Sequence, residues 1–79
     1  MKKVLILGST GSIGKSTLDV ILANPNKYEI TALVANTNEE EICTQANKFN
    51  VKNISLASKN KLDSKYDFDG NFFDYSRLD

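Results

Sequence analysis

A glycine-rich stretch near the amino terminus, ILGSTGSIGKST at residues 6–17, has the residue types that bind phosphate groups. Glycines let backbone amides approach phosphate oxygens, and the amino end of a following helix adds partial positive charge. Two unrelated loops fit this composition. Residues 9–16 differ at one position from the Walker A loop of nucleoside triphosphatases, and residues 8–14 form a Gly-x-x-Gly-x-x-Gly turn, as in some dinucleotide-binding folds.

The Walker A interpretation needs a glycine where this chain has Ser9, and a loop counted from Gly8 is one residue too long. It also needs a carboxylate near magnesium, usually an aspartate at the end of another strand. Neither candidate strand, EITALVAN at 29–36 or NISLAS at 53–58, ends in one. We therefore interpret Lys15 as a solvated surface lysine and the ATPase as the less favoured alternative.

The dinucleotide interpretation accounts for every glycine of the stretch. Gly8 would permit a tight turn, Gly11 would let the backbone approach a pyrophosphate, and Gly14 would let the helix pack closely. The hydroxyl groups of Thr10 and Ser12 can add hydrogen bonds. We therefore predict a dinucleotide turn.

A second diagnostic position follows the next candidate strand, where folds specific for NAD place an acid against the ribose 2′-hydroxyl. Asn36, Thr37 and Asn38 stand there instead, and the absence of an acid favours NADP. No arginine or lysine follows the strand, so the expected cation for a 2′-phosphate is missing. These residues also suit a turn and a helix cap, and both roles are compatible.

The elements that must position these residues alternate along the chain. We expect strands at 4–7, 29–35 and 54–57, a helix at 12–23, and a second helix that begins after Asn38 with Glu41 in its capping box. The β-α-β-α-β order predicts the α/β class, with a Rossmann-like parallel sheet and right-handed crossovers.

Each helix shows apolar residues at helical spacing, which predicts a packed face. In the first helix these residues are Ile13, Thr17, Leu18, Val20, Ile21 and Leu22. In the second they are Ile42, Cys43, Ala46 and Phe49, so we expect Cys43 in the core. Asp19 is expected to be solvated rather than catalytic.

The chain changes character near residue 59, so we divide it into residues 1–58 and a polar, aromatic tail at 59–79. The tail carries five of the seven aromatic residues: Tyr66, Phe68, Phe72, Phe73 and Tyr75. Asp69, Gly70 and Asn71 could form a hairpin turn, or the tail could belong to a larger sheet. The two alternatives stay open at this point.

Composition excludes several function classes. The ten basic and ten acidic residues give no net charge, so neither nucleic acid nor a membrane is expected as a partner. A single cysteine suits a reducing cytoplasm. The chain has no histidine, the commonest general base and transition-metal ligand, and we assign no catalytic and no metal-binding residue.

The combination of GSTGSIG, STLDV at 16–20 and Asn24-Pro25 resembles the amino terminus of the 1-deoxy-D-xylulose 5-phosphate reductoisomerase family. The resemblance covers about residues 1–57 and implies an NADPH-binding Rossmann domain that is incomplete relative to the family's. It implies nucleotide contacts by these residues: Gly8, Thr10, Gly11, Ser12, Ile13, Asn36, Thr37 and Asn38. The family usually has Ala-Gly-Lys-Asn where this chain has residues 35–38, so the family's lysine is absent.

The resemblance also implies a function for the full-length enzyme. It rearranges 1-deoxy-D-xylulose 5-phosphate and reduces it with NADPH to 2-C-methyl-D-erythritol 4-phosphate, with Mg or Mn gripping the substrate, in isoprenoid biosynthesis. Family members are several times longer, with the acidic metal ligands and a lid in later domains, so the resemblance implies that this piece is inactive alone. The family is expected to form homodimers. The alternatives are a non-catalytic nucleotide-binding module or remnant, or the start of another NADP-dependent dehydrogenase.

Overall fold

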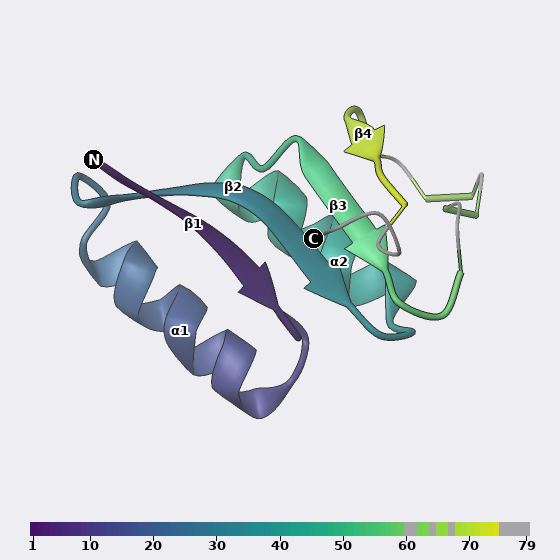
Figure 1. The fold of residues 1–79 in the computed structure, drawn as a ribbon, viewed down its shortest axis with the longest axis horizontal. Coiled ribbons are helices and arrows are strands. Elements are labelled where there is room, and N and C mark those ends of the chain that lie inside the picture. The colour runs from purple at the N-terminus through teal and green to yellow at the C-terminus, as the bar shows by residue number, and fades with distance from the viewer. Residues whose placement is uncertain (60–61, 64, 67, 75–79) are drawn as a thin grey trace.

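Four parallel strands form one sheet whose spatial order, β1-β2-β3-β4, is the order of the chain (Figure 1). The computed structural model describes residues 1–59, 62–63, 65–66 and 68–74. Its elements are β1 (Lys2–Leu7), α1 (Ser12–Ala23), β2 (Tyr28–Ala35), α2 (Glu39–Phe49), β3 (Asn53–Leu56) and β4 (Asn71–Phe72). The predicted α/β class and the β-α-β-α-β order are confirmed, and a fourth strand extends them.

The helix ends follow from local chemistry. Asn24 is the C-cap of α1. Its side-chain amide donates to the Val20 carbonyl at 2.8 Å, and its backbone N–H donates to Ile21 O at 3.0 Å. Helix α2 ends at Asn50 in the left-handed conformation (φ 58°, ψ 42°), which asparagine tolerates better than most residues. The bounds of α1 are those predicted from the sequence.

Both helices cover the same face of the sheet. Residues at alternate positions of β2 point to one face, and Leu33 and Ala35 join one buried cluster with residues of both helices. From α1 this cluster takes Leu18 and Ile21, and from α2 it takes Ile42, Cys43 and Ala46. The expected core position of Cys43, which is 5% exposed, is therefore confirmed.

The face predicted for α1 is too wide. Ile13, Val20 and Leu22 are 83%, 57% and 52% exposed, whereas only Gly14, Leu18 and Ile21 of this helix are buried. The physical reason is the position of α1 beside β1, the edge strand of the sheet, where only a narrow stripe of the helix meets other residues.

The opposite face of β1 is also open. Leu5 and Leu7 pair in register with Ala32 and Val34 of β2, which are buried, yet the two leucines are 42% and 59% exposed. Val20 of α1 lines a groove of about 400 Å³ together with β1. Exposed apolar side chains therefore lie along β1, whose outer edge is not paired with another described strand.

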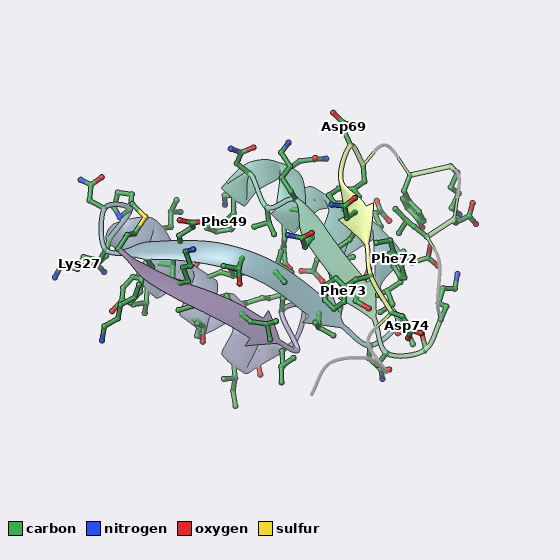
Figure 2. All side chains as sticks on the ribbon, turned by 45° about the horizontal axis from the view of Figure 1, so that its top comes forward. Lys27, Phe49, Asp69, Phe72, Phe73 and Asp74 are labelled. Carbon is green, nitrogen blue, oxygen red and sulfur yellow. The ribbon has the colours of Figure 1, made fainter. Side chains whose placement is uncertain are left out.

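The tail contributes a strand rather than a hairpin. Asn71–Phe72 pairs parallel with β3, and Ser55 Oγ donates to the Phe73 carbonyl at 2.7 Å. Figure 2 shows Phe72 and Phe73 beside β3, with Asp69 at the loop tip before β4. The tail therefore joins the sheet of this chain, which differs from the predicted hairpin, and its place in a larger sheet stays a prediction; Tyr75 lies outside the described residues.

Neither helix in the described ranges is long and apolar enough to cross a membrane.

Candidate nucleotide-binding site

The carboxyl ends of β1, β2 and β3 point to one edge of the sheet, where the two predicted site segments meet (Figure 1). The glycine turn follows β1 at this edge. Gly8 N and Ser9 N donate to the Val34 carbonyl at 2.7 and 3.0 Å, and Gly11 N donates to Gly8 O at 3.0 Å. These bonds fold the turn back onto β2 and place it beside the segment that follows Ala35.

Backbone geometry requires glycine at two of the three positions in the turn. Gly8 has φ 72°, a region that other L-residues rarely adopt. A Cβ on Gly14 would lie 2.1 Å from the Gly8 carbonyl oxygen and 2.7 Å from Ser9 Cα, so only glycine lets α1 pack this close. A Cβ on Gly11 would meet only Gly8 O at 3.4 Å, which leaves its outer side open for a ligand.

The amino end of α1 has free donor capacity for an anion. The first amides of a helix have no carbonyl partner within the helix. Gly11 occupies the N-cap position without a side-chain cap, and no acidic residue lies in the first turn. Ser12 and Ile13 are exposed, and Thr10 is half-buried. This start can bind a negatively charged group such as a pyrophosphate, so these residues fit a dinucleotide.

The segment after β2 is divided between two roles. Asn38 caps α2, because its Oδ1 accepts from Glu41 N at 3.1 Å while its amide donates to Glu41 Oε2 at 3.2 Å. The predicted cap is therefore confirmed, and the side chain of Asn38 is committed to the helix. Asn36 and Thr37 are exposed and remain available to a ligand.

A third segment, which sequence reasoning missed, joins the site from the end of β3. Ser58 Oγ donates to the Asn36 carbonyl at 2.7 Å, and Ser58 N donates to the same oxygen at 3.2 Å. The next residue, Lys59, forms an ion pair with Glu39 in the first turn of α2. No spacing along the chain signals this contact, because it spans twenty residues and depends on the order of the strands.

The Glu39 carboxylate is held from two sides. It hydrogen-bonds the Lys59 ammonium and also accepts from Asp63 N at 3.0 Å. The bond from Lys59 lowers the pKa of Glu39 below its usual carboxyl range, and the bond to Glu39 raises the pKa of Lys59. Both groups are therefore charged at neutral pH.

Two further contacts connect the glycine turn to α2. Gln45 Nε2 donates to the Ser9 carbonyl at 2.8 Å from a buried position, and Lys15 pairs with Glu41 at 2.9 Å. Lys15 is at the surface, as predicted, but it is paired with Glu41. Gln45 was missed, although its position three residues after Ile42 places a polar side chain on the apolar face of α2.

The described part of the chain contains no group of three or more histidine, cysteine, aspartate or glutamate residues that could hold a metal ion. Asp19 is exposed, as expected.

Comparison with known proteins agrees with this geometry. Residues 4–68 match the family model of 1-deoxy-D-xylulose 5-phosphate reductoisomerase. A relative of that name from Haemophilus ducreyi is 48% identical over 59 residues, which are 75% of this chain and 15% of the relative. Another from the Wolbachia of Culex pipiens is 46% identical over 59 residues, with the same shares.

Solved structures give the same result. The Zymomonas mobilis enzyme in complex with NADPH superposes with a TM-score of 0.66 at 42% identity, over 70% of this chain and 15% of that one. A reductoisomerase in complex with NADPH, fosmidomycin and magnesium gives a TM-score of 0.68 at 38% identity, over 71% of this chain and 14% of that one.

The chain spans about 15% of the length of the curated relatives it matches, and that part carries the glycine turn and the first strands of a Rossmann-like sheet. The match to the family model extends over most of its residues. The chain therefore belongs to the 1-deoxy-D-xylulose 5-phosphate reductoisomerase family.

Proposed function

We propose that this chain binds NADPH at the carboxyl edge of its sheet, as the nucleotide-binding part of a reductoisomerase. The observation that carries the proposal is the start of α1. The close packing of this helix start on the turn requires two glycines, Gly8 and Gly14. The N-cap residue, Gly11, has an open outer side. Two solved relatives that superpose on this part are complexes with NADPH, which supports the choice of ligand.

The proposed contacts divide the cofactor between the two predicted segments. Thr10, Ser12 and Ile13 hold the pyrophosphate through backbone amides and hydroxyl groups, and Gly8 and Gly11, whose own amides bond within the fold, let it approach the turn. The second segment, Asn36, Thr37 and Asn38, lies at the adenosine ribose, where Asn38 acts through its cap on α2. NADPH supplies a hydride when it is bound. This chain's part is to bind and orient the adenosine half of the cofactor.

We also propose that these residues alone perform no turnover. In the full-length enzyme the substrate is the phosphosugar 1-deoxy-D-xylulose 5-phosphate, and a divalent metal takes part. Solved relatives are in complex with magnesium. No metal-binding cluster occurs among the described residues of this chain. We further propose a cytoplasmic protein that forms homodimers in its full-length form and binds neither nucleic acid nor membranes.

Isothermal titration calorimetry of the 79-residue chain tests the binding proposal. We expect NADPH to bind with micromolar affinity and ATP–Mg to bind far more weakly. Gly11→Val places a branched side chain over the open side of the turn, and should weaken NADPH binding at least about tenfold while circular dichroism shows an intact fold. Unchanged affinity in Gly11→Val, or preferred binding of ATP–Mg, would contradict the proposal.

A turnover assay tests the second part. The chain is mixed with 1-deoxy-D-xylulose 5-phosphate, NADPH and Mg²⁺, and absorbance at the nicotinamide band is followed. We expect no consumption of NADPH above the rate without protein. Measurable consumption by the purified chain would show that the described residues suffice for catalysis.

A further inference from the structure

The edge that would meet the adenosine ribose lacks a cation in the expected segment. A fold that selects NADP over NAD places a basic side chain near the ribose 2′-phosphate, after the second strand. Residues 36–38 contain only Asn36, Thr37 and Asn38, and the next three residues are glutamates. A phosphate dianion placed beside this segment needs positive charge from another part of the fold.

A positively charged side chain comes close to this segment from the end of β3. Ser58 is fixed to the Asn36 carbonyl by both its hydroxyl group and its backbone N–H, so the two segments lie in direct contact. Lys59 follows Ser58 directly, and its ammonium reaches Glu39 at the start of α2. The Lys59 ammonium thus lies beside Glu39, the residue directly after the segment where the ribose is proposed to lie.

We propose that Lys59 is the residue that recognises the 2′-phosphate of NADPH and sets the preference for NADPH over NADH. The inference rests on the proposed function, because it assigns the specificity of that same site. Lys59 belongs to a different strand end from the one that usually carries this cation, so the site has gained its charge from β3.

The partner of Lys59 explains how one lysine can serve two anions. An ammonium carries three N–H donors, and Glu39 occupies one side of it. The Lys59 side chain keeps 45% of its surface exposed, whereas the Glu39 side chain keeps 11%. Glu39 also accepts a hydrogen bond from Asp63 N at 3.0 Å, so its carboxylate has a second partner besides Lys59. The ion pair orients the ammonium and cancels a carboxylate charge that would repel the ligand.

Lys15 is the competing cation at this edge. It belongs to the first turn of α1, next to the glycine turn, and its Nζ lies 2.9 Å from Glu41 Oε1. Among the residues that the structure describes, the hydrogen bonds to the Asn36 carbonyl come from Ser58, which makes two of them, and not from the segment of Lys15. The geometry therefore favours Lys59 at the 2′ position, and Lys15→Met provides a direct comparison.

Calorimetric titration with NADPH and with NADH, on the whole 79-residue chain, tests this assignment. We expect Lys59→Met to weaken NADPH binding about tenfold or more, since a charge-assisted hydrogen bond is lost, and to change NADH binding by less than about twofold. Lys59→Arg should retain the preference for NADPH over NADH because arginine keeps the positive charge. Lys52→Met is the matched control, because it removes an exposed lysine that precedes β3 at the other end of the strand.

The outcomes separate the two proposals. Equal losses for both nucleotides in Lys59→Met, an unchanged preference, or a preference lost in Lys15→Met would overturn the assignment of Lys59. If the unaltered chain binds NADPH and NADH equally well, the assignment fails while the proposed nucleotide site stands. If it binds neither nucleotide, both proposals fail.

Discussion

Replacing Gly14 by alanine tests whether close packing of α1 on the glycine turn forms the site. The added Cβ would stand 2.1 Å from Gly8 O, 2.7 Å from Ser9 Cα and 2.9 Å from Gly8 C. All three are backbone atoms, so no side chain can rotate away. Since ordinary contact begins near 3.4 Å, the helix and the turn must separate.

The magnitude follows from two opposing effects. Overpacking of this kind costs roughly 1–3 kcal/mol. Alanine is a better helix former than glycine by up to about 1 kcal/mol, which offsets part of the loss. We expect the free energy of unfolding to fall by about 1–2 kcal/mol, which is a large share of the stability of so small a domain.

Urea unfolding followed by circular dichroism measures this loss. With a slope of about 1 kcal/mol per molar urea, the midpoint of Gly14→Ala should fall by about 1–2 M. Gly11→Ala is the matched control, because its Cβ meets only Gly8 O at 3.4 Å and its φ is −80°. Because alanine is a poorer N-cap than glycine, its midpoint should fall by about 0.5 M, clearly less than that of Gly14→Ala.

The two variants should also differ in binding. Gly11→Ala should weaken NADPH binding while the fold stays intact, because the methyl group occupies the open side of the turn. A Gly14→Ala chain as stable as the unaltered one would refute the reasoning, since it would show that α1 does not press on the turn. Equal destabilisation by both substitutions would refute it as well.

Three further predictions concern α2, the core and the sheet edge. Asn38→Ala should lower the free energy of unfolding by about 1 kcal/mol through loss of the cap on Glu41 N, whereas Asn38→Asp should retain it, as thermal melting would show. Burial and the nearby Glu39 carboxylate raise the pKa of the Cys43 thiol. Stability should therefore fall as pH rises from the ordinary thiol pKa through the raised value, and iodoacetamide near pH 9 should alkylate the folded chain more slowly than the urea-unfolded one. The exposed β1 edge should let copies associate, and Leu7→Lys should lower the mass measured by sedimentation.

The glycine turn could be predicted from the sequence because its constraints are local. A tight turn, a close approach and a helix start must follow one another within seven residues, so the spacing of Gly8, Gly11 and Gly14 is informative on its own. The limits of α1 were predictable for the same reason, since Pro25 disfavours helical geometry in the residue before it.

The contacts that could not be predicted from the sequence depend on which strands become neighbours. The contact of Lys59 with Glu39 exists because β3 lies beside β2, and Gln45 reaches Ser9 because α2 packs near the turn. Periodicity likewise identifies the apolar positions of α1 but not the width of the surface they meet. Val20 is therefore exposed, although its spacing placed it on the packed face.

The agreement between strand order in space and strand order along the chain has a consequence for biosynthesis. Each strand adds to the outer side of its predecessor, as Lys2 pairs with Tyr28 and Leu33 with Ile54. Among the four described strands, none has to insert between two that are already paired. The polypeptide can therefore fold from its amino end as it leaves the ribosome, one strand and helix at a time. The glycine turn would be the first part of the candidate site to form.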